Sequence, residues 1–406
     1  MKNKYIATSF GLYLNYLVHG MGVILISLNM AHLQQQWQTD AAGVSVVISS
    51  LGIGRLSVLL VAGMLSDRFG RRPFIYLGMA CYLGFFLGIL STESIVVAYC
   101  FGFLAGMANS FLDSGTYPTL MEAFPNTPST ANILIKAFVS GGQFILPMII
   151  SVLVWFELWF GWAFLIAASI MLLNALCLFR CPFPPHGSQP EAEKETNIAE
   201  PPMAEGSPCR MLDLVSFTLY GYISMATFYL VSQWLAQYGQ FVAGMPYTSS
   251  IRLLSIYTVG SLLCVFITAG LVKKTVSSTT LLMLYTFISF VALLTVCLHP
   301  TVTTVMVFAF VIGFSAAGGV MQLGLTLMAM RFPHAKGKAT GIFYSAGSLA
   351  TFTIPLITAK LSQTSIASIM WFDVGLSAVG FLIALFIGYR NMKERRGAIK
   401  INQLQV

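Results

Sequence analysis

The chain has 406 residues, of which 57% are hydrophobic and only 9% are charged, and its formal net charge is +8. Charged residues make up about 25% of an ordinary soluble domain, so this composition excludes a soluble enzyme. A mean hydropathy of +0.79 suits a chain that a bilayer solvates along most of its length. We therefore expect an all-α membrane protein.

Apolar stretches of about 20 residues, the length that crosses a bilayer as a helix, recur between polar or Pro/Gly breaks. The first stretch is too long for the apolar part of a cleavable signal peptide, so we expect it to remain as a span. Twelve transmembrane helices are predicted, at residues 6–30, 43–65, 74–91, 94–121, 132–156, 158–180, 212–236, 249–271, 279–298, 302–328, 340–362 and 367–390.

Residues 181–210 interrupt this pattern with repeated Pro and Glu, a composition that does not bury a core and indicates a flexible linker. The linker separates an N-terminal half, residues 1–180, from a C-terminal half, residues 211–406. Short matches recur at a near-constant offset: FGLY from Phe10 returns as FTLY from Phe217, and Pro147 returns as Pro355. We therefore expect two parallel six-helix pseudo-repeats, an architecture suited to alternating access.

The distribution of Lys and Arg predicts the orientation of these spans. If both termini are cytoplasmic, most of the 22 basic residues fall in the inside segments, as the positive-inside rule requires. The seven cysteines lie in apolar runs or beside the linker and imply no disulfide framework. We found no P-loop, no HExxH or CxxC motif and no nucleophile paired with a base, so we expect no cofactor, no metal and no enzyme activity.

A charged turn joins the second and third spans in the segment GMLSDRFGRRP, residues 63–73. Glycine near the end of a span lets another helix approach, a second glycine permits the chain to reverse, and arginines hold the turn on the inner side. A charged turn that merely obeys the positive-inside rule explains the arginines alone. The glycine and charged residues of this turn are Gly63, Asp67, Arg68, Gly70, Arg71 and Arg72.

The whole eleven-residue pattern resembles the signature loop of the major facilitator superfamily, and the twelve spans, linker and half-repeat extend the resemblance over the whole chain. The resemblance implies that these six residues form a conformational gate, in which Asp67 engages a helix of the other half and the arginines join a charge network. Residues 140–147 do not match the glycine- and proline-rich pattern associated with drug/proton antiporters, which counts against efflux. The fourth span lacks the arginine that many proton-coupled members carry.

Two charged residues are predicted near the middle of the membrane, where an ionisable group costs a few kcal/mol and indicates function. At about 1.5 Å per residue, Arg55 and Asp113 differ in depth by about 5 Å, a gap that an arginine spans. The pair is either a static link within the N-terminal half or a proton-coupling site at Asp113 beside an anion contact at Arg55. Lys136, closer to the inner face, is expected to extend its amine to that interface, with pairing to Asp113 as the alternative.

Further polar residues fall on the spans that, by resemblance, line the central cavity. Asn15 and His19 share a face of the first span, although a buried histidine is also often a neutral hydrogen-bonding group. The seventh span carries a stripe of Tyr, Gln and Trp. Because an amide facing lipid would remain unsatisfied, we expect this stripe to face a water-filled cavity. The predicted substrate-binding residues, including Arg55, are Asn15, His19, Arg55, Asn109, Tyr222, Tyr229, Gln233, Trp234, Gln322 and Tyr344.

Asp373 and Lys360 are expected near the outer face, either paired with each other or hydrated. Taken together, these features predict a monomeric secondary transporter of the bacterial inner membrane that takes up a sugar, polyol or cyclic hydroxy acid together with protons. Its partners are then the solute, protons and the lipid bilayer, and no nucleic acid. Proton-coupled efflux of amphiphiles or metabolites is the alternative, and a non-transporting receptor is a third.

Overall fold

The computed structural model describes residues 4–124, 128–184, 210–274, 277–317, 320–332 and 336–404, and these residues form helices without strands. Most of the predicted linker, and the side chain of Asp67, lie outside this description. The helices are α1 Ile6–Leu28, α2 Met30–Gln36, α3 Ala41–Phe69, α4 Arg71–Ser91, α5 Ile95–Ala123, α6 Pro128–Trp155, α7 Trp162–Phe179, α8 Arg210–Phe241, α9 Tyr247–Lys274, α10 Ser278–Leu298, α11 Val302–Ile312, η1 Gly313–Ala317, α12 Val320–Arg331, α13 Lys336–Ser362 and α14 Ile366–Leu404.

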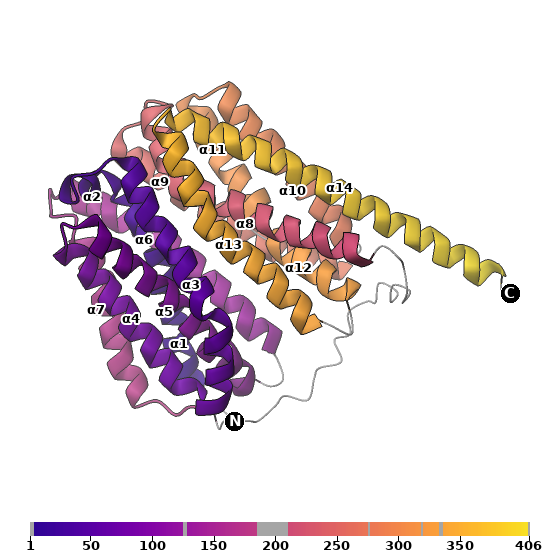
Figure 1. Cartoon of the computed structure of the whole chain (residues 1–406), viewed down its shortest axis with the longest axis horizontal. Helices are drawn as coiled ribbons and strands as arrows, with labels where there is room; N and C mark the ends of the chain where they lie inside the picture. Colours follow the sequence, from indigo (N-terminus) through magenta and orange to yellow (C-terminus); the bar gives the residue numbers. More distant parts are fainter. Residues whose placement is uncertain are drawn as a thin grey trace.

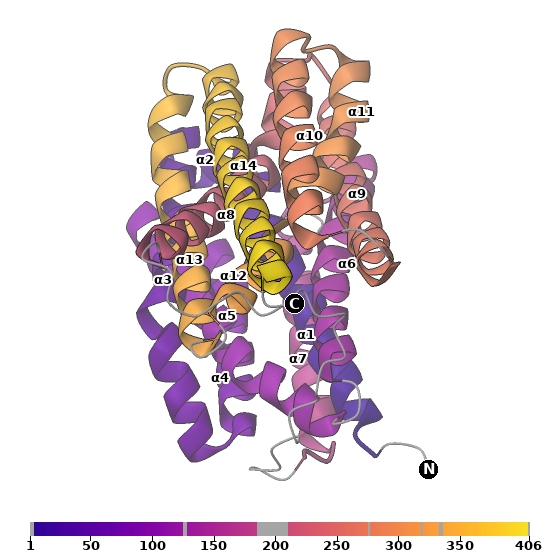
Figure 2. The same ribbon diagram turned by 90° about the vertical axis from the view of Figure 1, so that its right-hand side faces the viewer.

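Twelve stretches of the described helices are long and apolar enough to cross a membrane, which confirms the predicted number of spans. The tenth span is composite, because α11 continues into the π-helix η1 and then α12. Two elements differ from expectation. The short α2 follows α1 directly, and α14 runs to Leu404, well past the predicted end of the last span (Figures 1 and 2).

The residues at helix ends explain several of these boundaries. Asp40 caps α3 by accepting a hydrogen bond from the Gly43 amide at 2.8 Å. Gly70 separates α3 from α4 with a φ of +93°, a left-handed backbone conformation that favours glycine, so the predicted reversal occurs there. The two helices meet at what we call the basic end of the bundle, where α5 and α7 also finish; α2 lies at the opposite end.

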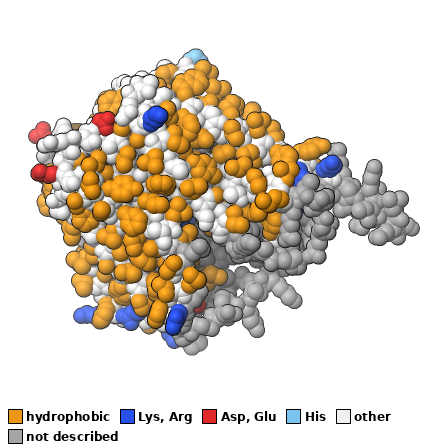
Figure 3. Space-filling view, in the orientation of Figure 1, with side chains coloured by type: hydrophobic (Ala, Val, Ile, Leu, Met, Phe, Trp, Pro, Cys, Tyr) orange, Lys and Arg blue, Asp and Glu red, His pale blue; other side chains and the backbone are white. Residues whose placement is uncertain are grey.

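Hydrophobic side chains cover most of the face in Figure 3, while Lys and Arg gather mainly at its lower edge, near the N-terminus (Figures 1 and 3). This exposed apolar surface is expected for a protein whose outer solvent is lipid. Large aliphatic and aromatic side chains such as Leu173, Phe179 and Leu382 are more than half exposed. The surface therefore agrees with a membrane position for the described helices.

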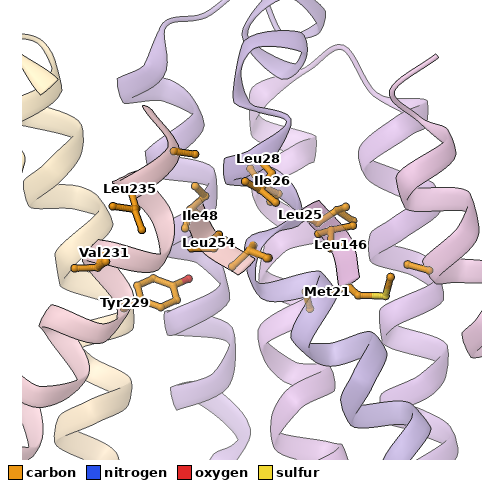
Figure 4. Packing of buried hydrophobic residues seen from close by; sticks show 14 of the residues in the cluster. Met21, Leu25, Ile26, Leu28, Ile48, Leu146, Tyr229, Val231, Leu235 and Leu254 are labelled. Carbon is orange, nitrogen blue, oxygen red and sulfur yellow. The ribbon is translucent and has the colours of Figure 1, made fainter. Parts of the chain in front are cut away.

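The first six spans pack mainly on one another, and so do the last six, with contacts between the halves through α3 and α13, α6 and α9, and α1 and α8. One buried hydrophobic cluster includes residues of both halves, and Figure 4 shows Leu25, Ile48, Leu146, Leu235 and Leu254, from α1, α3, α6, α8 and α9, in this shared core. A second cluster, which includes Phe217 and Phe332, belongs to the C-terminal half alone. The shared core thus joins the two halves.

The hydrogen bonds that join described residues of the two halves lie in the middle of the bundle or toward the end opposite the basic end. Ser45 of α3 donates to the Pro355 carbonyl of α13 at 2.8 Å, and Ser255 of α9 donates to the Phe144 carbonyl of α6 at 2.9 Å. Tyr247 donates to the Leu28 carbonyl at 2.9 Å. The described residues therefore close the bundle at the opposite end.

Candidate functional site

Arg55 and Asp113 form an ion pair in the middle of the N-terminal half. Arg55 Nη2 lies 3.1 Å from Asp113 Oδ2, and the side chains are 18% and 19% exposed. Close packing of α3 on α5 brings the two side chains together. A Cβ added at Gly106 of α5 would overlap the Leu51 carbonyl oxygen of α3 and lie 2.7 Å from the backbone nitrogen of Arg55. The pairing expected from the depths of the two residues is present in the structure.

Aromatic side chains surround this pair. The Tyr16 hydroxyl of α1 donates to Asp113 Oδ1 at 2.6 Å, and its ring lies 6.0 Å from that of Tyr117. His19 is hydrogen-bonded through Nδ1 to the hydroxyl of Tyr82 on α4. Both carboxylate oxygens of Asp113 therefore have a partner, and His19 belongs to the same polar cluster.

The C-terminal half faces the cluster with α13 and with the middle of its composite span. Tyr344 of α13 is close enough to Arg55, Asp113 and Tyr117 to interact with them electrostatically, and Gln322 lies near its hydroxyl. Asn109 is half-buried on α5, one turn before Asp113. Thus Arg55, Asp113, Tyr344 and Gln322, predicted from separate spans, lie in one region.

Lys136 differs from expectation, because its amine reaches the C-terminal half instead of the inner interface. Lys136 Nζ lies 3.4 Å from the Ala317 carbonyl oxygen of η1 and 5.9 Å from the centroid of the Phe228 ring. No described carboxylate lies within ion-pair distance of it. A cation without an acidic partner therefore lies between the halves, where the sequence placed no site residue.

Asn15 and Tyr222 do not join the cluster. Asn15 is fully buried and accepts a hydrogen bond at 2.7 Å from Asn174 of α7, so it faces its own half and not the other one. Tyr222 shares a hydrogen bond of 2.7 Å with Thr353 of α13. Their positions on a cavity-lining helix were predicted from helical spacing, which does not reveal which neighbour a side chain meets.

The stripe on α8 closes the bundle instead of lining an open cavity. Gln233 donates to the Val23 carbonyl of α1 at 2.9 Å, and Gln237 donates to the Ser27 carbonyl at 2.6 Å. Tyr229 and Trp234 are 4% and 1% exposed beside them. In this conformation the amides bind backbone across the contact between the halves.

The turn around Gly70 contacts its own half. Arg71 Nε lies 3.7 Å from Glu122 Oε1, and Arg72 donates to the Phe179 carbonyl at 2.9 Å, while Arg68 is exposed. No atom of the described residues lies within 4 Å of a Cβ placed at Gly63, so the expected approach of another helix there is not seen among them in this conformation. The role predicted for Asp67 falls on a side chain outside the described residues.

A second ionic cluster at the basic end escaped prediction. Asp213 Oδ2 of α8 lies 2.5 Å from Arg331 Nη2 of α12, and Asp213 Oδ1 lies 2.5 Å from Arg390 Nε of α14. The signal was an acid at the start of a span in a half whose inner segments are mainly basic. This cluster joins the basic ends of three helices of the C-terminal half.

The fold and these polar groups within it define a transporter rather than a catalyst. A family model described as Major Facilitator Superfamily matches residues 12–322 and 253–404, and the chain belongs to that family. It is 73% identical over 398 residues to the inner membrane transport protein YdiM of Escherichia coli (strain K12), covering 98% of this chain and 97% of YdiM.

A second relative and a solved structure extend the comparison. The inner membrane transport protein YdiN of the same strain is 37% identical over 394 residues, covering 96% of this chain and 92% of YdiN. The crystal structure of a D-xylose-proton symporter superposes with a TM-score of 0.76 at 16% identity, covering 94% of this chain and 96% of that one. The last comparison shows a shared fold.

Proposed function

We propose that this protein is a proton-coupled uptake transporter for a small polar organic solute, with Asp113 as the proton-coupling residue. It acts as a monomer in a bacterial inner membrane, with both termini and the basic end on the cytoplasmic side. Residues 1–180 and 211–406 would rock about the central region, and 181–210 would link them. The ion pair of Arg55 and Asp113, beside the contact between the halves, is the observation that supports this most directly.

The geometry supports a simple coupling step. Asp113 is partly exposed, so a proton can reach it, and protonation removes the charge that holds Arg55. The freed guanidinium then becomes a donor for an anionic group of the solute. Tyr16 keeps its hydrogen bond to Asp113 in either state, because a protonated carboxyl still has an acceptor oxygen. Proton and solute would therefore bind together.

The surrounding side chains favour one solute class among those expected from the sequence. The rings of Tyr117 and Tyr344 suit the C–H faces of a sugar, polyol or cyclic hydroxy acid, and the amide of Gln322 suits hydroxyl groups. Arg55, released when Asp113 is protonated, adds a positive charge. A hydroxy acid satisfies the ring faces, the amide and this charge together.

Solute-evoked proton movement in proteoliposomes that hold a pH-sensitive dye tests the proposal. We expect one small polar compound, most readily a hydroxy acid, to carry protons with it. The Asp113→Asn variant should lose this proton movement. Asp40→Asn is the matched control, because Asp40 is an exposed helix cap to which asparagine is equally suited.

Two outcomes would replace the proposal. Normal proton-coupled uptake by Asp113→Asn would remove Asp113 from the mechanism. A response only to amphiphiles, with protons moving opposite to the solute, would establish the efflux function instead.

A further inference from the structure

Asp373 of α14 is a buried carboxylate inside the C-terminal half, away from the Arg55–Asp113 pair. Asp373 is 0% exposed, and neither of its carboxylate oxygens has a hydrogen-bond partner among the described residues. The expectation that Asp373 pairs with Lys360 or is hydrated is therefore wrong: Lys360 is exposed, and Asp373 is buried in the helix packing. A buried, unpartnered carboxylate in a native fold calls for an explanation.

The described groups close enough to Asp373 to interact with it electrostatically come from three other helices and carry no positive charge. They are the hydroxyl of Thr227 on α8, Tyr257 on α9 and Cys297 on α10. None of the ion pairs between described residues includes Asp373. An ionised carboxylate removed from water without a counter-charge would cost several kcal/mol, so a cation must accompany it.

A hydroxyl-lined cavity of about 20 Å³ adjoins this position. Thr227 lines it, as does Ser377, which lies one turn after Asp373 on α14, and Ser289 of α10 contributes a further hydroxyl. Thr227 Oγ1 and Ser289 Oγ, like the oxygens of Asp373, have no hydrogen-bond partner in the part of the chain that the structure describes. Four buried oxygen atoms of one small region thus lack a partner.

The cavity also borders the π-helix η1 through Ser315 and Ala316. Single π-helical turns within a helix are rare and occur frequently at functional sites. Carboxylate and hydroxyl oxygens are the donors that hard cations prefer. The region therefore combines a negative charge, spare oxygen donors and space in a part of the membrane that lacks other charges among the described residues.

We propose that Asp373, with Thr227 and the neighbouring hydroxyls, binds a monovalent cation, either a proton or Na⁺, as a second cation site in the C-terminal half. The bound cation neutralises the charge of Asp373. It does not require Asp113 to be the coupling residue, because the two carboxylates belong to different halves and have different partners.

Labelling of the purified full-length protein with dicyclohexylcarbodiimide tests the site without a transport assay. This reagent modifies carboxyls that are protonated in apolar surroundings, and peptide mass spectrometry locates the product. We expect Asp373 to be modified in mildly acidic buffer and progressively less as the pH rises. Asp213, which two arginines hold as a carboxylate, is the internal control that should stay unmodified.

A Na⁺ series at constant pH separates the two cations. Protection of Asp373 by Na⁺, but not by an equal concentration of choline, would show that Na⁺ occupies the site, whereas labelling that depends on pH alone would show a proton site. Absence of label at Asp373 at every pH and salt condition would overturn the proposal.

The variants Asp373→Asn and Asp113→Asn keep this result distinct from the proposed function. Asp373→Asn should lose the label, and its uptake should lose the dependence on the cation that protects or titrates the wild type. Asp113→Asn should keep the label at Asp373 while it loses proton-coupled uptake. If uptake by Asp373→Asn kept the wild-type dependence on both cations and the wild type took up no label, the carboxyl would be a structural group only.

Discussion

The ion pair of Arg55 and Asp113 can be either a static link between α3 and α5 or part of the transport cycle, and single substitutions do not separate the two. Each side chain is about four-fifths buried, so removing one partner leaves the other charge poorly compensated. Replacing both residues by amides leaves two neutral side chains, so neither charge remains without its partner. The two roles therefore differ most in the double variant.

We expect Arg55→Gln and Asp113→Asn each to lower stability by about 1–3 kcal/mol, because each leaves a buried charged group without its partner. The double variant Arg55→Gln/Asp113→Asn should recover most of that loss but remain without proton-coupled uptake. Thermal unfolding in detergent and the dye assay measure the two effects on the same preparations. A double variant that is stable and transports like the wild type would reduce the pair to a structural link.

For individual residues, the depth along a helix could be predicted from the sequence. The direction in which a side chain points around the helix could be predicted only in part. Counting residues placed Arg55 and Asp113 within reach of each other, and the structure joins them. The same counting placed Asp373 near the outer face but could not show that it points into its own half. Gln233 was expected in a cavity, yet it binds the Val23 carbonyl, because which groups meet across the halves depends on the conformation.

Among the helices, the contact between α3 and α5 controls the geometry of the candidate site. Small residues allow this close approach, as at other membrane helix contacts. Gly106 faces the backbone of α3 directly, whereas nothing lies within 4 Å of a Cβ placed at Gly141 of α6. The two glycines belong to the same half and differ in whether a methyl group has room.

Gly106→Ala should therefore push α3 and α5 apart and lower stability by about 1–3 kcal/mol, as overpacking usually does. Because Arg55 follows the contacted backbone, uptake should fall as well. Gly141→Ala, the matched control, should unfold at the wild-type temperature or slightly above it. Equal melting temperatures of the two variants in detergent would contradict this account of the contact.

The elements themselves were largely predictable, because hydropathy determines which segments enter the membrane. Each predicted span corresponds to a helix or, for residues 302–328, to α11, η1 and α12 together. The short α2 and the polar extension of α14 carry no long apolar run, so hydropathy does not reveal them. The π-helix depends on packing: a Cβ at Gly313 would overlap the Tyr257 carbonyl of α9.

For the whole molecule, the described contacts between the halves define a bundle closed at the end opposite the basic one. Alternating access requires these contacts to break in each cycle. Ser45 Oγ and Thr358 Oγ1 lie 3.3 Å apart across the contact between α3 and α13. The positions are therefore close enough for a disulfide between substituted cysteines, whose sulfurs need a separation of about 2 Å.

We expect Ser45→Cys/Thr358→Cys, in a background with the seven native cysteines replaced by serine, to cross-link under mild oxidation. The cross-link should abolish uptake, and dithiothreitol should restore it, because the halves can then separate again at this end. Each single cysteine variant should transport equally with and without oxidant. Full uptake by the cross-linked protein would mean that this contact stays closed throughout the cycle.

The same cross-linked protein tests which side of the membrane the basic end faces. Tyr117, near the ion pair, is 38% exposed. A cysteine there should therefore react with a membrane-impermeant thiol reagent that enters from the basic end. With the opposite end locked and the basic end cytoplasmic, Tyr117→Cys should react in inside-out vesicles and not in right-side-out vesicles. The reverse pattern would place the basic end outside the cell, against the distribution of Lys and Arg.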